Sequence, residues 1–360
     1  MRSRLSAPFL EEMRAFGPLA DDRTVNFRPI IMEGKIRPYI LSNNLLEQIN
    51  GSVVYASKPL FMSFGLGLIN KICKKHKIVL DIDDWDYGFI KDFFSNLNYF
   101  NKALYLGYSS LFVYDNMSYW NNFMFEKITR FADAVTVSNT FLQRKFGGEI
   151  IWHARDCREF DPSLFDQTIL REKYGLSSER KYILFLGSPR PHKGIEDLIQ
   201  AVKYVGREDT SLLLVGLDDS DYCKKIKSIG LAGLGDKIAF WPNIPFSQVP
   251  EVLTLADIVV VPQREQLSSY GQFPAKIFDA MAMAKPIIST NVSDIPLILD
   301  QCGWITDPGS YQQLAEAIHY VLDHPSIAQN RALSARQKCI RNYSYDSVGQ
   351  RLDHIIQSLL

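Results

Sequence analysis

The stretch from Asp257 to Thr290 constrains the fold of this chain more than any other segment. An apolar run from Ile258 to Val261 ends at Pro262 and leads into a polar loop. A helix is expected to begin near Pro274, and a second strand is expected from Pro286 to Ser289. Strand, helix and strand in this order predict a βαβ unit, the building block of a parallel sheet.

The loop and the helix start inside this unit lie at the carboxyl end of a buried strand, where doubly wound folds bind their ligands. Pro274 suits the first helical turn, because the amide hydrogen that proline lacks would be unpaired there. The free backbone amides of Phe273, Ala275 and Lys276 then favour an anion in front of the helix. Lys276 and Asp279 are suited to hold a phosphate and a sugar hydroxyl together. The alternative is that these two side chains only pair with each other on a solvated helix.

Length and composition narrow the class of protein. A chain of 360 residues exceeds the ~250–300 residues that a single hydrophobic core serves, which favours two domains. Basic and acidic residues both number 40, so no net field attracts nucleic acid or a membrane. The five cysteines are odd in number and form no C-x-x-C pair, which predicts reduced thiols in a cytoplasmic protein. No apolar run has the length of a signal peptide or a membrane span.

Strand and helix signals alternate along the whole chain, which predicts parallel α/β architecture in both halves. In the first half we expect strands at 24–31, 52–56, 77–81, 132–138 and 149–152 and helices at 39–49, 63–75 and 139–146. In the second half we expect strands at 182–186, 211–215 and 237–241 and helices at 195–205, 311–322 and 345–360.

A polar segment around Pro162 predicts a linker between two domains. We expect an N-terminal domain over residues 1–165 and a C-terminal domain over residues 166–340. The remaining residues, 341–360, are expected to form a closing helix that could cross back to the first domain.

Three carboxylates follow the strand expected at 77–81, in the sequence DIDDWD. Asp83, Asp84 and Asp86 should therefore emerge at the carboxyl end of a parallel strand, where ligands bind. Such a cluster would suit a hard cation such as Mg²⁺. The alternative, which we favour, is that the carboxylates cap the following helix, so that no metal is bound.

The segment from Trp85 to Phe125 is rich in aromatic residues. Its rings could line an acceptor pocket or rest on a membrane interface, where amphipathic rings are favoured. The alternative is ordinary packing of helices against the sheet. The basic run from Lys71 to Lys77 could face anionic lipid, or it could be a solvated helix end.

A basic loop, GSPRPHKG, joins a buried strand to an amphipathic helix in the second half. Gly187 and Gly194 bracket the loop, and Arg190, His192 and Lys193 bring cations to a helix start that would by itself prefer anions. A phosphate held between these side chains would explain the pattern. The alternative is a surface turn that happens to be basic.

The second half resembles the nucleotide-sugar-binding domain of the retaining family 4 glycosyltransferases of GT-B fold. The similar segments include FLGSPRPHKGIEDLIQAV from Phe185, LADIVVVP from Leu255 and FPAKIFDAMAMAKPIISTNVSDIP from Phe273. Together they cover most of residues 180–310 in the family's order and spacing. RFADAVTVSNTFLQRKFG and IIWHARDCREFDP in the first half match more weakly. The resemblance implies two Rossmann-like, doubly wound α/β domains that face a cleft.

The resemblance also implies which residues bind the donor diphosphate. Lys193 matches the lysine of the family's basic pair. Ser188 stands where the family usually has an arginine directly after Gly187, and Arg190 is the expected substitute. The backbone amides near Phe273 would complete the diphosphate site.

Other positions of the donor site depart from the family pattern. Asp279 stands where the family has the glutamate that binds the ribose. Gly271, eight residues earlier, stands where the family has the first glutamate of the pair, so the contact to the donor sugar is missing or comes from Glu265 or a backbone group. Asn243 is expected to border the base.

The resemblance implies a retaining, metal-independent transfer of a hexosyl group from a nucleoside-diphosphate sugar. Arg190, Lys193 and Lys276 would stabilise the departing diphosphate, because fixed positive charge aimed at developing negative charge is usually the largest catalytic effect. Asp83 or Asp84 would receive the acceptor proton or hold the acceptor. No cofactor is expected beyond the donor substrate.

The expected partners are the donor and a sugar, lipid-linked or small-molecule acceptor, with peripheral membrane contact as a further option and no nucleic acid. A different interpretation is a non-catalytic partner protein that keeps the fold and binds nucleotide sugars. It is motivated by Gly271 and by Asp83, which replaces a histidine of the family. An epimerase or phosphorylase on the same fold is a third interpretation.

Overall fold

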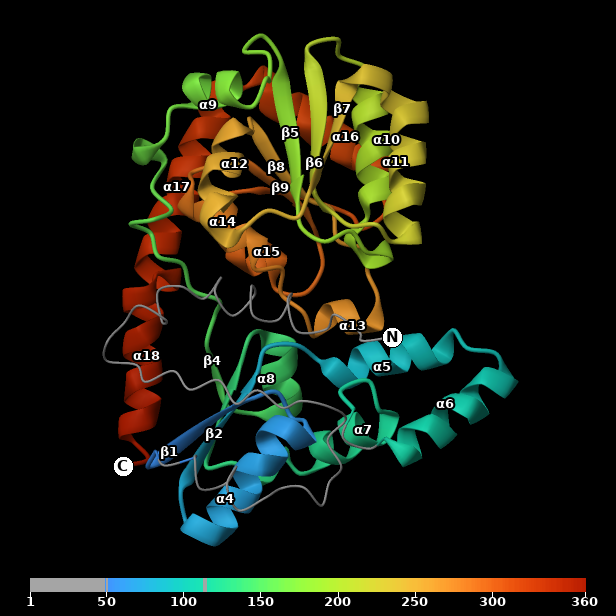
Figure 1. The fold of residues 1–360 in the computed structure, drawn as a ribbon. Helices are drawn as coiled ribbons and strands as arrows, with labels where there is room; N and C mark the ends of the chain where they lie inside the picture. Colours follow the sequence, from blue (N-terminus) through green and yellow to red (C-terminus); the bar gives the residue numbers. More distant parts are fainter. Residues whose placement is uncertain (1–48, 50, 113–114) are drawn as a thin grey trace.

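Two parallel sheets with flanking helices make up the computed structural model, which describes residues 49, 51–112 and 115–360 (Figure 1). This confirms the predicted α/β class. The strand expected at 24–31 and nearly all of the helix expected at 39–49 lie outside the described residues. The predicted domain boundaries stay predictions.

The first sheet has four described strands in chain order, all parallel. Its second strand, Lys77–Ile82, is buried on both faces, which explains why Ile78, Val79, Leu80 and Ile82 are apolar without alternation. The predicted strand at 149–152 is shorter than expected. The strands are β1 (Val53–Ser57), β2 (Lys77–Ile82), β3 (Ala134–Val137) and β4 (Glu149–Ile150).

The helices of the first half begin where polar side chains cap them. Asn98, Ser118 and Asn139 each accept a hydrogen bond from the amide three residues later, which satisfies an otherwise unpaired donor of the first turn. The helix predicted at 63–75 begins with a π-turn. The described helices are η2 (Phe61–Gly65), α4 (Leu66–Lys74), α5 (Asp86–Ser95), α6 (Tyr99–Leu111), α7 (Tyr119–Lys127), η3 (Thr129–Phe131) and α8 (Thr140–Phe146).

The second sheet has six parallel strands in the order β10-β9-β8-β5-β6-β7. The direction of the order reverses between β5 and β8, which are neighbours. Loops that leave the carboxyl ends of two such strands diverge, and open α/β sheets bind ligands at this point. The strands are β5 (Lys181–Leu186), β6 (Thr210–Leu217), β7 (Ile238–Pro242), β8 (Ile258–Val261), β9 (Ile287–Thr290) and β10 (Trp304–Thr306).

Helices cover both faces of the second sheet. The named helices are α9 (Gln167–Lys173), α10 (Ile195–Val205), α11 (Asp221–Leu234), α12 (Val249–Leu255), α13 (Leu267–Tyr270), α14 (Lys276–Ala282), α15 (Ile295–Ile298), α16 (Tyr311–Asp323), α17 (Pro325–Tyr343) and α18 (Tyr345–Gln357). The short turns are η4 (Pro162–Leu164), η5 (Pro191–Lys193), η6 (Gly235–Lys237) and η7 (Phe246–Gln248). Two predictions need correction. Helix α13 occupies part of the expected polar loop, and α14 begins two residues after Pro274.

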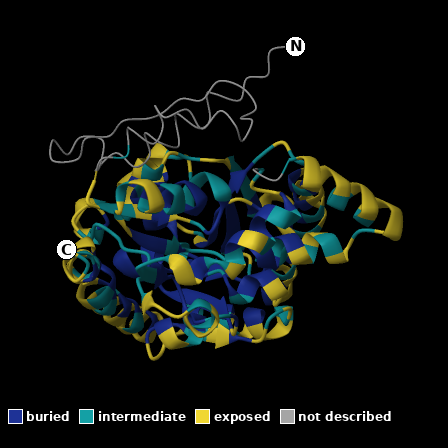
Figure 2. Ribbon diagram, turned by 90° about the horizontal axis from the view of Figure 1, so that it is seen from below, coloured by how far each residue is buried: buried dark blue, intermediate teal, exposed yellow. Residues whose placement is uncertain are grey.

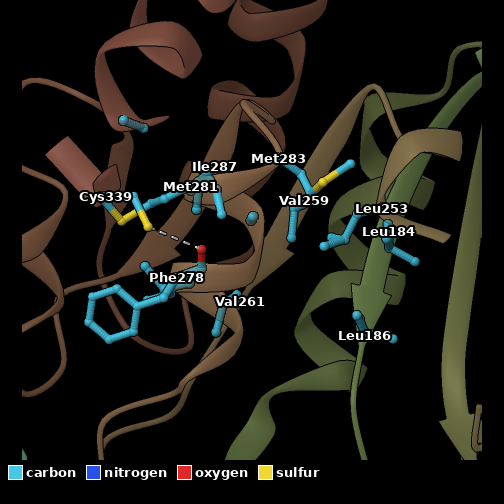
Figure 3. Close-up of a cluster of buried hydrophobic side chains, with 14 of the residues drawn as sticks. Leu184, Leu186, Leu253, Val259, Val261, Phe278, Met281, Met283, Ile287 and Cys339 are labelled. Carbon is cyan, nitrogen blue, oxygen red and sulfur yellow. Dashed lines mark hydrogen bonds between the residues drawn. The ribbon is translucent and has the colours of Figure 1, made fainter. Parts of the chain in front are cut away.

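Helix α14 is the buried helix of the unit that constrained the fold from the start. Figure 3 shows Phe278 and Met281 of this helix, and Met283 just after its end, among Val259 and other apolar side chains of the neighbouring strands. All of these side chains are almost completely buried. The close packing fixes the orientation of α14, and with it the position of its polar residues.

No helix within the described residues is long and apolar enough to cross a membrane. In Figure 1, α17 runs along the second sheet and α18 continues toward the level of the first. The backbone is extended at Ser344, between the two helices. There the amide of Arg155 donates to the carbonyl oxygen of Tyr343 at 2.9 Å, and the amide of Tyr345 donates to the carbonyl oxygen of Arg155 at 3.0 Å.

Candidate functional site

The loop between β5 and α10 lies at the switch point of the second sheet, and two glycines permit its close contacts. Gly187 has φ of 142°, and a Cβ there would lie 2.0 Å from Cε of Lys276. Gly194 has φ of 66°, and a Cβ there would lie 1.9 Å from the carbonyl oxygen of Pro262. A side chain at 187 would displace the end of Lys276, and one at 194 would push the loop away from the backbone just after β8.

Lys193 ends the η5 turn and points toward the segment that follows β8. Its Nζ lies 2.7 Å from Oε1 of Gln272 and 3.3 Å from Oε1 of Gln263. Burial, reinforced by the charge of Lys276, lowers the pKa of Lys193 to about 8 although Asp84 opposes the shift. Its neighbours within hydrogen-bond distance, among the described residues, are neutral amides rather than carboxylates, so its charge remains available to an anion.

Arg190 does not join Lys193. Its Nη1 lies 2.8 Å from the carbonyl oxygen of Pro189 and 3.5 Å from Oδ2 of Asp218, and its side chain is 51% exposed. Ser188, at the start of the same loop, is exposed. Of the basic pair expected from the resemblance, the structure therefore places Lys193 at the switch point and leaves Arg190 in a partly solvated ion pair with Asp218.

Asp279 lies on the buried side of α14 and is held by Arg155. The Nε of Arg155 donates to Oδ1 of Asp279, and its Nη2 donates to the carbonyl oxygen of Ala275 at 3.1 Å. Burial disfavours the charge of Arg155, but Asp279 outweighs it and raises the pKa of the guanidinium. The alternative that Lys276 and Asp279 only pair on a solvated helix is therefore wrong, because Asp279 is buried and paired with Arg155.

Burial lowers the pKa of Lys276, although Asp279 opposes the shift. The side chain of Lys276 crosses directly over Gly187, which brings its amine to the loop that carries Lys193. Two partly desolvated lysines and the loop backbone thus surround one place at the switch point. This arrangement suits an anion with several oxygens.

One lysine, which the sequence analysis did not single out, lies beside the three carboxylates of the first half and is their counter-charge. Nζ of Lys58 lies 3.4, 3.8 and 3.0 Å from carboxylate oxygens of Asp83, Asp84 and Asp86, respectively. Trp85 rather than a carboxylate precedes α5 and makes no side-chain cap, so the predicted capping role is wrong. Burial, with the charge of Asp83, raises the pKa of Asp84 to about 6.

The metal alternative for this cluster finds no support in the described residues. No group of three or more histidine, cysteine, aspartate or glutamate side chains is arranged there to hold an ion. A φ of 74° at Lys58, just after β1, turns the chain toward the end of β2. Lys58 therefore reaches the acidic residues as their counter-charge.

The two halves touch at Gly271, where the family has the first glutamate of its pair. The amide of Trp85 donates to the carbonyl oxygen of Gly271 at 3.0 Å, and an isolated bridge pairs Asp84 with Gln272. A Cβ on Gly271 would lie 2.3 Å from Cβ of Trp85. A side chain at 271 is thus excluded by the first half, which places the carboxyl group of Asp84 beside the segment instead.

The remaining predicted residues lie farther from this centre. The ring of Phe273 is buried, 5.0 Å from the ring of Phe278, so only the backbone of Phe273 is available to a ligand. Asn243 is exposed in the loop after β7. Glu265 accepts a hydrogen bond from the hydroxyl of Tyr270, and the contact of Glu265 to a donor sugar stays a prediction.

Further hydrogen bonds join the halves beside this place. The amide and the hydroxyl of Thr140 donate to Asp294 at 2.7 and 2.6 Å. The amide of Ser268 donates to Oδ2 of Asp92 at 2.8 Å. These contacts hold α8 against the segment that follows β9, and α5 against α13.

Comparison with known proteins places this geometry in context. Residues 166–342 match the sequence model of a family described as glycosyl transferases group 1. The chain is 25% identical over 193 residues to the alpha-D-kanosaminyltransferase of Streptomyces kanamyceticus, which covers 53% of this chain and 48% of that protein. The chain thus spans about half the length of the curated relatives it matches.

Solved structures of the GT-B fold resemble the whole molecule. The sucrose-phosphate synthase of Thermosynechococcus elongatus superposes with a TM-score of 0.69 at 19% identity, covering 88% of this chain and 76% of that one. HepE of Anabaena, solved in complex with UDP-glucose, gives a TM-score of 0.67 at 18% identity, covering 88% and 81%. These likenesses confirm the predicted GT-B fold.

Proposed function

Because residues 166–342 belong to the glycosyl transferases group 1 family, we propose that this chain transfers a sugar from a nucleoside-diphosphate sugar to an acceptor, with retention of configuration. The observation that carries the proposal is the meeting of Lys193, Lys276 and the Gly187 backbone at the switch point of the second sheet. The complex of the similar Anabaena protein with UDP-glucose supports a nucleotide sugar as donor.

The chemical task is to stabilise the diphosphate as it leaves the sugar. Lys193 and Lys276 are buried enough to be poorly solvated, so their charges act strongly on an anion between them. Two glutamines hold Lys193 in place before any ligand arrives, and the missing side chain of Gly187 leaves room for Lys276 beside the loop. These residues supply the positive charge of the proposed mechanism without a metal ion.

Asp279 is suited to orient the ribose. Arg155 occupies its Oδ1, and no hydrogen bond to its Oδ2 is formed by the described residues. One oxygen of a fixed carboxylate would then accept from a ribose hydroxyl, which is a positioning role. Arg155 acts through Asp279 and is a positioning residue as well.

Asp84 and Asp83 form the acceptor side of the proposed site. The pKa of Asp84, raised to about 6 by burial, lies near neutral pH, where a carboxylate works well as a proton acceptor. The charge of Asp84 also acts on Lys193, which supports an acceptor side close to the proposed diphosphate position. Asp84 would therefore receive the acceptor proton or hold the acceptor hydroxyl.

The proposed acceptor is a sugar, a lipid-linked molecule or another small molecule, and no cofactor beyond the donor is proposed. All five cysteines of the chain are free, which supports a reducing, cytoplasmic setting. The exposed aromatic side chains of the first half motivate peripheral membrane contact.

A panel of nucleoside-diphosphate sugars, screened by thermal stabilisation and then by turnover, tests the proposal. At least one donor should raise the melting temperature and release nucleoside diphosphate. Lys193→Ala should lower donor turnover by about 100-fold or more, the range for losing one preorganised charge contact. Lys203→Ala, an exposed lysine on α10, should leave turnover unchanged.

Near-normal turnover by folded Lys193→Ala protein would sink the assignment. Binding of nucleotide sugars without turnover of any donor would instead favour the non-catalytic partner. Product analysis separates a transferase from an epimerase or a phosphorylase.

A further inference from the structure

Helix α6 carries a stripe of large apolar side chains on its outer face. Phe100, Leu104, Tyr108 and Leu111 follow one another at helical spacing, and Tyr99 lies beside them. Tyr99 is 92% exposed, Leu111 78% and Phe100 71%. Soluble monomers rarely expose so continuous an apolar surface without a function.

The opposite face of α6 is firmly attached to the protein. The ring of Tyr105 lies 5.3 Å from that of Phe93, and its hydroxyl donates to a carbonyl of the following turn. Ser109 is completely buried, and its hydroxyl accepts from the amide of Tyr119 at 3.1 Å. The orientation of the helix is therefore fixed, and the stripe is held outward.

Helices α5, α6 and α7 form an arm that extends away from both sheets (Figure 1). Figure 2 shows the end of this arm largely in the colour of exposed residues. We call residues 86–130 the aromatic arm. A flat surface can reach its outer helix without meeting the rest of the described molecule.

Charge is arranged unevenly on the aromatic arm. Each of its acidic residues beyond the first turn of α5 has a partner within the protein: Asp92 accepts from Ser268, Asp115 from Tyr108 and Met117, and Glu126 from Trp85. Four cations lie over aromatic rings and have no carboxylate partner among the described residues: Lys91, Lys102, Lys127 and Arg130. The arm thus presents apolar groups and positive charge together.

We propose that the aromatic arm docks on an anionic membrane surface, with the α6 stripe in the interface and the exposed Lys91, Lys127 and Arg130 facing lipid headgroups. Tyrosine places an apolar ring and a polar tip at such a boundary, and lysine can keep its amine in water. The 13-residue helix α6 is about 20 Å long and lies in the plane of the interface rather than across it.

Charge favours a membrane over a second copy of this chain as the occupant. Two stripes packed face to face would offer each other no negative charge, because α6 carries no carboxylate, and the exposed cations of the arm would stay unpaired. Anionic headgroups supply the missing negative charge.

Docking would orient the proposed active site toward the membrane, a consequence that rests on the proposed function. Helix α5 begins at Asp86, two residues after Asp84, and its ten residues lead directly toward α6. At 1.5 Å per residue, α5 spans about 15 Å, so the acceptor-side carboxylates lie within reach of a headgroup. This geometry favours a lipid-linked acceptor among the acceptor classes.

Flotation of the full chain with phosphatidylcholine vesicles, with and without phosphatidylglycerol, tests the docking itself. The protein should float with anionic vesicles and much less with neutral ones. Replacing Phe100, Leu104 and Leu111 together by serine should reduce the floating fraction at least tenfold while the melting temperature stays unchanged. Serine at Leu164, Ile169 and Leu231, which are similarly exposed in the second half, is the matched control.

Three results would overturn the proposal: wild-type protein that stays at the bottom with anionic vesicles, equal flotation of the stripe variant, or a dimer that the stripe variant converts to a monomer. Conversion of a dimer to a monomer would assign the stripe to a second copy of the chain. Wild-type protein that does not float with anionic vesicles would mean that another part of this chain covers the stripe. Thermal stabilisation by UDP or GDP should be equal in the stripe variant and the wild type. Failure of docking is therefore distinguishable from failure of the proposed donor site.

Discussion

The two parallel sheets differ in strand order, and the difference explains why the basic loops of the proposed donor site come from the second half only. The second sheet reverses direction between β5 and β8, so the loops that carry Lys193 and Gln263 diverge and leave room for a ligand. The described strands of the first sheet run in chain order without a reversal. The loop after its β2 instead leans on the second half at Gly271.

The second half alone carries the cations of the proposed anion site, Lys193 and Lys276. The first half contributes Asp84 only through its contact with the second half. Asp84 belongs to the proposed site only because Trp85 packs on Gly271. Changes in the second half should therefore affect donor binding directly, and changes at the contact should affect both halves together.

The largest expected effect is on the buried pair that supports α14. Arg155→Leu leaves the carboxylate of Asp279 buried without its cation, which should cost about 3–5 kcal/mol of unfolding free energy and weaken donor binding. Urea unfolding measures the loss. Arg158→Ala breaks an ion pair whose arginine is 80% exposed and should leave the unfolding free energy nearly unchanged. Equal losses in the two variants would show that Asp279 does not depend on Arg155.

The contact between the halves can be broken at Gly271. Gly271→Glu installs the residue that the resemblance leads one to expect, but its side chain meets Trp85, so we expect a loss of about 1–3 kcal/mol and reduced donor turnover. Thermal unfolding and a turnover assay measure both effects. Gly349→Ala, whose Cβ meets nothing within 4 Å in α18, should be neutral or stabilising. Higher turnover at unchanged stability in Gly271→Glu would refute this account of the contact.

Titration of Lys193 should separate donor binding from folding. With a pKa of about 8, Lys193 is mostly neutral at pH 9, so donor affinity should fall by about tenfold between pH 7 and pH 9. Calorimetry at the two pH values measures the change. Lys193→Arg keeps its charge and should lose this pH dependence. A fall of the same size in Lys193→Arg would assign the titration to another group.

Stability should respond to the same pH range with the opposite sign. The folded pKa of Lys193 lies below its ordinary value of 10.5, so between about pH 8 and 10.5 the unfolded chain binds a proton that the folded chain does not. The free energy of unfolding therefore receives a contribution that rises with pH in that window. Buried Lys285, whose pKa is also about 8, contributes in the same direction.

The smallest effect is expected at Arg190. This side chain is half-exposed and lies 3.5 Å from Asp218, so Arg190→Ala should lower donor turnover by at most about fivefold. Measuring it beside Lys193→Ala ranks the two cations of the loop. A loss as large as that of Lys193→Ala would mean that Arg190 leaves Asp218 and contacts the diphosphate.

The sequence predicted elements whose signals are local. The strand Ile258–Val261 and the helix Ile195–Val205 have the predicted bounds, because apolar periodicity and flanking proline or glycine define both within a few residues. Helix α13 escaped prediction because its four residues lie in a polar stretch and are too few to show a period. The start of α14 was placed two residues early because Pro274 was read as part of its first turn.

The partners of the site residues could not be predicted, because they come from distant parts of the chain. Arg155 meets Asp279 across 124 positions, and Lys193 meets Gln272 across 79. No spacing rule connects such residues before the sheets are assembled. Lys58 was missed for the same reason, since nothing in its own neighbourhood marks it as the counter-charge of the acidic cluster.

The position of Arg155 has a consequence for synthesis of the protein. Its side chain donates a hydrogen bond to Asp279, which lies 124 residues later in the sequence. Its backbone forms hydrogen bonds with Tyr343 and Tyr345 near the end of the chain. At roughly 5–20 residues per second, the ribosome needs about 6–25 s to supply Asp279 alone. The guanidinium of Arg155 therefore stays unpaired until Asp279 has been synthesised. The backbone hydrogen bonds that hold Arg155 beside α14 form only after Tyr343 and Tyr345 have followed.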